Sequence, residues 1–220
     1  MHAYIIHGYG ASPTDHWFPW LQARLQAAGI PTIVPPLPDS EHPDFAAWQA
    51  TLRQTIGMPD RNTLLIAHSL GTISLLHYLS TTRPTAVGGL VLVAGFGARL
   101  PELPIIGGFD IGTYIDHARL DDVVLRRYAA QIHHLISDND YVVAPANSHA
   151  LAARLGGTVH ALPRCGHFLS ADGITELPAA WEALQSCFSG EDHVEDHYAG
   201  EKTRRTQHGR IPRLLARTFR

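Results

Sequence analysis

The sequence has no long hydrophobic run and few cysteines. None of its apolar stretches approaches the roughly 20 residues that a helix needs to cross a bilayer, so we expect no membrane span. The apolar stretch that follows Met1 is too short for a secretory signal and has no basic residues before it, which favours a cytoplasmic protein. The cysteines, Cys165 and Cys187, lack the spacing of metal ligands. We therefore expect two reduced thiols.

The sequence also lacks the patterns that bind nucleic acids and nucleotides. The formal net charge is −3 at pH 7, and acidic residues outnumber basic ones within residues 1–188. Such a composition offers no basic stripe for a phosphate backbone. The glycine-rich segment 7–12 contains neither G-x-G-x-x-G nor Gly-Lys-Ser/Thr, the loops that hold nucleotide phosphates. We expect no nucleic acid partner, and the sequence leaves the oligomeric state open.

What the sequence does contain is a regular alternation of short apolar runs with stretches of helical periodicity. This alternation is typical of a mainly parallel sheet with helices on both faces, and continuous apolar runs indicate strands buried on both sides. At 220 residues the chain suits one such α/β domain. The predicted strands are 3–7, 32–35, 63–68, 89–94, 131–137 and 158–162. The predicted helices are 17–28, 45–56, 70–80, 145–155 and 175–187.

Two segments depart from this alternation. Residues 95–128 begin rich in glycine and proline and become helical near 120–128. Because long excursions in compact domains usually serve a site, this one is interpreted either as a lid or pocket wall or as an irregular connection. Residues 189–220 are polar with mixed charge, which is typical of a disordered tail. The predicted domain therefore covers residues 1–188.

The third predicted strand runs into the sequence Ala-His-Ser-Leu-Gly at residues 67–71, from which a helix begins. Small residues on both sides of a serine allow the sharp strand-to-helix turn of the G-x-S-x-G nucleophile elbow, which exposes the serine hydroxyl. Ala67 replaces the first glycine of that motif but keeps the position small. Because serine also commonly caps helices, the motif by itself leaves both interpretations of Ser69 open.

A serine nucleophile needs a histidine base and an acid that orients the base. In proteins with a nucleophile elbow these groups follow in the order Ser, Asp, His, each at the carboxyl end of a strand. Asp138 and Asp140 come after the fifth predicted strand, and His167 comes after the sixth. This order predicts a triad of Ser69, Asp140 and His167. Asp140 is preferred because the distance to the next predicted helix fits it better, and Asp138 would then shape the turn.

Acyl transfer to a serine also needs hydrogen-bond donors for the negative oxygen of the tetrahedral intermediate. The amide of Leu70 directly follows the serine at a helix N-terminus and is the natural first donor. The second should come from the loop after the first strand, where Gly8 and Gly10 let the backbone turn its amides inward. The amide of Tyr9 is the best placed in that loop.

Together these segments resemble the small serine hydrolases of the α/β-hydrolase superfamily, the family of the bacterial YdeN-type proteins and the retinoblastoma-binding serine hydrolases of animals. The resemblance covers about residues 3–188. It rests on His-Gly-Tyr at 7–9, on His-Trp-Phe-Pro-Trp at 16–20 and on the motifs around the three triad residues. It implies the α/β-hydrolase fold with a minimal sheet of about six strands, the same triad and no cofactor.

The aromatic stretch opens a helix just after the oxyanion loop. His16 and Trp17 are therefore candidates for the substrate pocket, and so is Phe168, which directly follows His167. Aromatic residues at the start of a helix more often pack in the core, and this is expected for Trp20.

The leading hypothesis is a serine hydrolase that cleaves carboxylic esters, or thioesters or amides, of small acyl groups through an acyl-enzyme. Its partner is a small-molecule ester. One alternative is a protein-interaction module on the same fold. Another is a metal site at His193 and His197, which stand beside acidic residues near the end of the chain. Solvated charge explains that group more simply, so no metal is expected.

Overall fold

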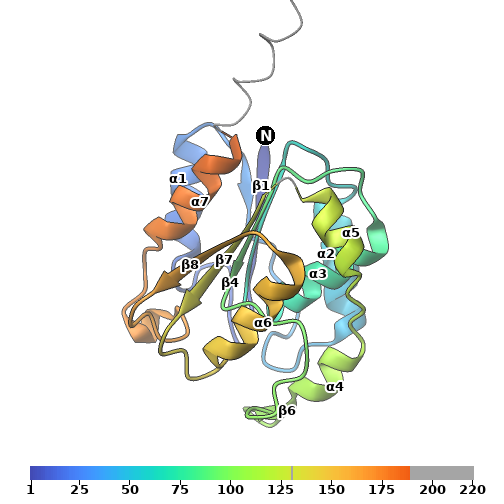
Figure 1. Cartoon of the computed structure of the whole chain (residues 1–220), viewed down its shortest axis with the longest axis vertical. Coiled ribbons are helices and arrows are strands. Elements are labelled where there is room, and N and C mark those ends of the chain that lie inside the picture. The colour runs from blue at the N-terminus through green and yellow to red at the C-terminus, as the bar shows by residue number, and fades with distance from the viewer. Residues whose placement is uncertain (130, 189–220) are drawn as a thin grey trace, which may run out of the picture. The chain divides into compact units, whose positions relative to one another are not determined.

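A parallel six-stranded sheet lies at the centre of the computed structural model, which describes residues 1–129 and 131–188 (Figure 1). The strands follow the spatial order β2-β1-β3-β4-β7-β8, and every neighbouring pair is parallel. All six predicted strands are confirmed to within two residues at each end. Their bounds are β1 His2–Ile6, β2 Thr32–Ile33, β3 Thr63–His68, β4 Gly89–Val93, β7 Ile132–Ser137 and β8 Thr158–Leu162.

The two central strands are apolar because they are covered on both faces. Every residue of β3 and β4 is buried, as expected for the interior of a parallel sheet between two helical layers. The register pairs Ala67 with Leu92 and His68 with Val93. The residue that follows β3 therefore emerges in the middle of the carboxyl edge of the sheet, which is where ligands bind in open α/β folds.

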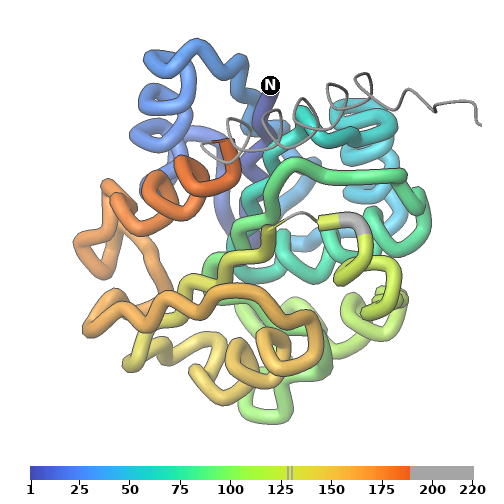
Figure 2. The backbone as a smooth tube through the Cα atoms, turned by 45° about the horizontal axis from the view of Figure 1, so that its top comes forward, coloured from blue at the N-terminus to red at the C-terminus, as the bar shows by residue number. Residues whose placement is uncertain are grey.

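Helices cover both faces of the sheet and enclose two hydrophobic cores. Figures 1 and 2 show α1 (Phe18–Ala27) and α7 (Pro178–Phe188) next to each other on one face. The other face carries α2 (Phe45–Ile56), α3 (Leu70–Thr82) and α6 (Pro145–Leu155). These five helices confirm the predicted ones, with ends that shift by up to three residues. No helix within the described ranges has the length and hydropathy for a membrane crossing.

The segment between β4 and β7 contains elements that the sequence pattern did not predict. A small hairpin pairs β5 (Ile105–Ile106) with β6 (Phe109–Asp110), and it leads directly into α4 (Ile111–Asp116). Strands of two residues and a helix of six are too short to produce a recognisable period. The helix α5 (Asp122–Tyr128) follows near the predicted position. In Figure 1 the hairpin and α4 lie at the end of the molecule opposite the start of β1.

The boundary at residue 188 stays a prediction, since residues 189–220 lie outside the described ranges. The tail and the histidine pair near residues 193–197 belong to that part of the chain. Helix α7 begins at Pro178, three residues after the predicted start. Proline suits the first turn of a helix, because its missing N–H would have no helical partner there.

Candidate active site

Ser69 occupies a sharp turn between β3 and α3. Its backbone has φ 52° and ψ −124°, a conformation that costs a residue with a side chain of the order of 1–3 kcal/mol and therefore needs support from its surroundings. Its amide donates to the Val93 carbonyl at 3.0 Å. The side chain makes no capping hydrogen bond to α3. The geometry thus differs from that of an ordinary serine cap and matches a nucleophile elbow.

Two glycines let the neighbouring backbone pass close to this turn. A Cβ on Gly71 would lie 2.4 Å from the carbonyl oxygen of His7, so α3 packs against the end of β1 without room for a methyl group. A Cβ on Gly8 would lie 3.0 Å from the Cβ of Ser69. The loop after β1 is consequently pressed against the elbow, as an oxyanion loop needs to be. Ala67 is fully buried, so its methyl group fits where the motif usually has glycine.

His167 connects Ser69 to Asp140. Its Nε2 lies 2.9 Å from Ser69 Oγ, and its Nδ1 lies 2.9 and 3.0 Å from the two oxygens of Asp140. All three side chains are buried. A carboxylate accepts only hydrogen bonds, so the Nδ1 of His167 carries the proton. Nε2 is then free to accept the proton of the serine hydroxyl, which is the arrangement that a general base needs.

Asp140, the predicted triad acid, and Asp138, its alternative, have different contacts. Asp140 Oδ1 accepts the amides of Val142 and Val143, each at 2.9 Å, in addition to His167. Within the described residues Asp138 makes no hydrogen bond to the imidazole; its Oδ1 instead accepts the amide of Arg164 at 2.8 Å. The carboxylate of Asp140 is therefore held by its own turn and aimed at the histidine, while that of Asp138 fastens the histidine loop to β7.

A third carboxylate, which belongs to no recognised sequence motif, supports the histidine loop. Asp172 Oδ2 accepts the amides of His167 and Leu169 at 2.9 and 3.1 Å, and its Oδ1 accepts the hydroxyl of Tyr141 at 3.1 Å. These bonds hold the backbone on both sides of Phe168. The sequence offered no signal for this role, since an aspartate five residues after a histidine has many ordinary explanations.

His68, the residue before the candidate nucleophile, touches the same loop from the other side. It is buried, and its Nε2 donates to the backbone carbonyl of His167 at 2.9 Å. Its Nδ1 has no hydrogen-bond partner among the described residues. Burial, together with the nearby imidazole of His167, lowers the pKa of His68 well below its usual value. The ring is therefore neutral near pH 7 and bears its proton on Nε2.

The backbone amides expected to bind an oxyanion lie near the candidate nucleophile. Leu70 is the first residue of α3, so its amide has no carbonyl partner within the helix. A Cβ on Gly8 would stand 3.4 Å from this Leu70 nitrogen, which shows how close the loop that includes Tyr9 comes to the helix start. The ring of Tyr9 stacks on Phe109 of β6, with 5.7 Å between centroids.

A cavity of about 250 Å³ opens beside Ser69. His16 lines it, but Trp17 and Phe168 do not: both are fully buried in the core beneath α1 and α7. Trp20, expected in the core, is only half-buried and lies under the guanidinium of Arg24. The complete lining is Tyr9, Gly10, His16, His68, Ser69, Phe96, Leu100, Ile106, Ile111, Val142, Val143, His167 and Leu169.

Within residues 1–129 and 131–188, no three histidine, cysteine or acidic side chains gather as a metal site would require. The described cysteines are free thiols, and burial raises the pKa of Cys187 to about 11. Cys165 lies on the histidine loop with its amide bonded to the Ser137 hydroxyl at 3.2 Å. The acid–base groups of the site are thus the serine, the histidines and Asp140.

Comparison with known proteins identifies the family of the chain. The model of the serine hydrolase family matches residues 3–186. The candidate hydrolase YdeN of Bacillus subtilis (strain 168) is 35% identical over 189 residues, which cover 86% of this chain and 96% of YdeN. The crystal structure of the ydeN product superposes with a TM-score of 0.79 at 34% identity, covering 86% of this chain and 98% of that one.

More distant structures share the fold alone. Est1E from Butyrivibrio proteoclasticus superposes with a TM-score of 0.63 at 16% identity, over 85% of this chain and 88% of Est1E. A hydrolase of the α/β superfamily from Xanthomonas campestris pv. campestris gives 0.56 at 17% identity, over 84% and 98% of the two chains. With the family model matching nearly all of the described residues, the chain belongs to the serine hydrolase family and has the α/β-hydrolase fold.

Proposed function

We propose that the protein is a serine hydrolase that cleaves carboxylic esters of small acyl groups through a covalent acyl-enzyme. The observation that carries this proposal is the 2.9 Å contact between Ser69 Oγ and His167 Nε2 at the wall of a cavity. A buried serine and histidine pair with no chemical task would not need the strained backbone that Ser69 adopts. Thioesters and amides are reached by the same chemistry with other leaving groups.

In the first half of the reaction, the hydroxyl of Ser69 gives its proton to His167 Nε2 while Oγ bonds to the ester carbonyl carbon. The carbonyl oxygen becomes an oxyanion, which the amides of Leu70 and Tyr9 receive. The intermediate collapses when the bond to the alcohol oxygen breaks. His167 then returns the proton to the leaving alcohol, and the acyl group remains on Oγ.

In the second half, water takes the place of the alcohol. His167 removes one proton from the water while the water oxygen attacks the acyl carbon. The bond between that carbon and Oγ then breaks, and His167 passes the proton to Oγ. The carboxylate of Asp140 stabilises the imidazolium, and the amides of Val142 and Val143 hold it in place beside the ring. The acid is released and Ser69 is restored.

The proposal is tested with a fluorophosphonate probe and with p-nitrophenyl acetate. We expect the folded protein to be labelled on the peptide that contains Ser69 and to release p-nitrophenol. Both signals should disappear in Ser69→Ala. Ser40→Ala is the matched control, because Ser40 is half-buried and does not line the cavity. A folded protein that neither reacts with the probe nor turns over the ester would contradict the proposal.

A further inference from the structure

The walls of the cavity beside Ser69 are apolar. Phe96, Leu100 and Ile111 are buried residues of its lining, and Ile106 and Leu169 are partly exposed, which places them toward its rim. Among the described residues that line it, none is aspartate, glutamate, lysine or arginine. Its polar side chains are those of Tyr9 and of the serine and histidines already described. The cavity therefore has no fixed countercharge for an ionic group.

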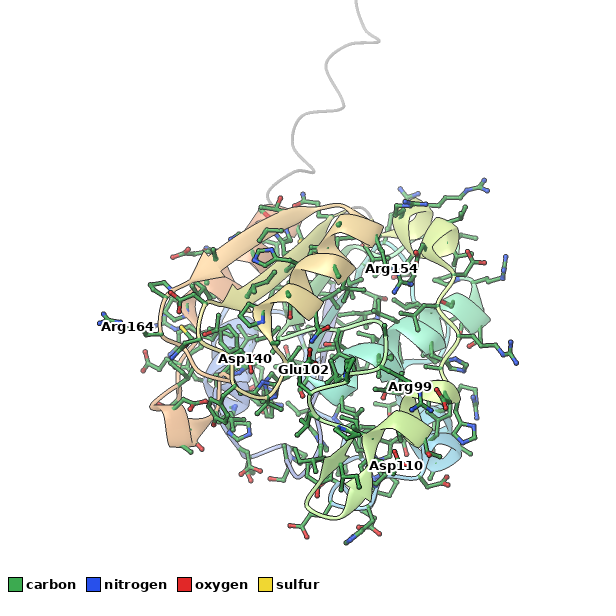
Figure 3. The ribbon with its side chains drawn as sticks, turned by 60° about the horizontal axis from the view of Figure 1, so that its bottom comes forward. Arg99, Glu102, Asp110, Asp140, Arg154 and Arg164 are labelled. Atoms are coloured by element: carbon green, nitrogen blue, oxygen red, sulfur yellow. The ribbon has the colours of Figure 1, made fainter. Side chains whose placement is uncertain are left out.

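Two arginines and a glutamate of the neighbouring segments do not line the cavity. Arg99 is exposed and pairs with Asp116 on α4. Arg164 and Arg99 lie toward opposite sides of Asp140 in Figure 3, with the Arg164 side chain extending out from the surface. Glu102 is exposed and does not belong to the cavity lining. A carboxylate group that entered the cavity would lose its hydration without gaining an ion pair from an arginine or lysine of the lining, which is costly.

The volume limits the size of the group that fits. At roughly 30 Å³ for each water-sized volume, a cavity of about 250 Å³ holds about eight non-hydrogen atoms. The acyl group stays bonded to Oγ after the alcohol has left. The space directly around Ser69 Oγ must therefore accommodate the acyl group rather than only the leaving alcohol.

We infer that the enzyme selects uncharged, apolar acyl groups of about four to eight carbons, and that Ile106 at the cavity rim is a specificity-determining residue. This inference rests on the proposed function and adds the substrate class to it. An anionic acyl group of equal size is rejected because nothing in the lining compensates its charge. Long fatty acyl chains are disfavoured because a cavity of about 250 Å³ does not hold them.

The test compares p-nitrophenyl 4-methylpentanoate with p-nitrophenyl hemisuccinate, whose acyl groups have nearly the same shape and differ in one carboxylate. We expect kcat/KM to favour the neutral ester by about 100-fold, the size expected for an uncompensated buried charge. Across the straight-chain esters, kcat/KM should be highest between four and eight carbons and fall for sixteen.

Ile106→Arg places a cation at the rim. It should raise kcat/KM for the hemisuccinate, relative to kcat/KM for the 4-methylpentanoate, by about 10-fold. Ile105→Arg is the matched control: Ile105 precedes Ile106 in β5, is 60% exposed and does not line the cavity. Successive strand residues face opposite sides, so this control should leave the ratio unchanged. Equal rates for the two esters in the parent protein, or equal effects of the two arginines, would overturn the inference.

Labelling of Ser69 by the fluorophosphonate probe separates the two proposals. If Ser69 is labelled and esters are hydrolysed without the expected selectivity, only the substrate class is wrong. If the folded protein shows neither labelling nor hydrolysis, the proposed function is wrong, and the substrate class inferred from it is wrong with it.

Discussion

The imidazole of His68 donates a hydrogen bond from Nε2 to the backbone carbonyl of His167 across 2.9 Å, although the two residues are 99 positions apart in the chain. The bond joins the end of the central strand β3 to the loop that presents the candidate general base. We therefore expect His68 to act on the proposed reaction through the position of His167, as a positioning residue.

Replacing His68 tests this relationship. We expect His68→Ala to lower kcat by about 10-fold, since losing a buried hydrogen bond costs about 1–1.5 kcal/mol and frees the histidine loop, while KM changes less. His68→Gln can place an amide nitrogen near the former Nε2 and should restore most of kcat. Thermal melts of both variants check that they are folded. If Gln and Ala lower kcat equally at similar melting temperatures, the hydrogen bond has no positioning role.

The two aspartates after β7 should behave differently. Asp140→Asn removes the charge that stabilises the imidazolium and is expected to lower kcat by about 10³–10⁴-fold, the usual effect of losing a triad acid. Asp138→Asn keeps an oxygen that accepts the Arg164 amide, so we expect kcat within about 3-fold of the parent. Ester hydrolysis by the two purified variants decides the question. If kcat falls further in Asp138→Asn than in Asp140→Asn, then Asp140 is not the triad acid.

Gly71 is a position at which an added methyl group has no room. Gly71→Ala would bring a Cβ to 2.4 Å from the His7 carbonyl oxygen and 2.6 Å from that of Ile6. Because both contacts are with backbone atoms in the core, we expect the free energy of unfolding to fall by about 2–3 kcal/mol. Gly29→Ala is the control, where a Cβ meets nothing within 4 Å and only the positive φ of 78° is strained. Urea unfolding of both variants should show a smaller fall in the free energy of unfolding for Gly29→Ala than for Gly71→Ala.

The sequence predicted those features that depend on local pattern. The central strands were recognisable because a sheet covered on both faces requires continuous apolar runs. Ser69 was recognisable because small residues flank its turn. The choice between Asp138 and Asp140 depended on which carboxylate turns toward a loop about 27 residues away, and spacing alone could not fix that direction.

Features that depend on long-range packing were not predictable. The contact of His68 with the histidine loop and the clamp formed by Asp172 exist only once distant segments meet. Trp17 and Trp20 share one aromatic stretch, yet the first is fully buried and the second is not, because packing against distant segments decides which ring is covered. The β5–β6 hairpin is too short to leave a periodic signal.

The buried histidines make the fold sensitive to acid. Burial lowers the pKa of His7, His68 and His134, so these rings resist protonation in the folded state, while unfolded histidines take up protons below about pH 6.5. Above that pH both states are neutral at these positions and stability is unaffected. Below it the unfolded state binds more protons, and stability falls as the pH approaches the lowered folded values.

Each such histidine should contribute a loss of up to about 1.4 kcal/mol per pH unit below pH 6.5. His134 is suited to isolate one contribution: its Nε2 donates to the Gly156 carbonyl at 2.9 Å, and it does not line the cavity at Ser69. His134→Gln can preserve that donor without a titrating ring. Urea unfolding at pH 7.5, 6.5 and 5.5 should show a shallower acid loss in the variant, with ester hydrolysis at pH 7.5 unchanged. If the free energy of unfolding depends on pH equally in the parent and the variant, then His134 binds protons equally in the folded and unfolded states, and this prediction is wrong.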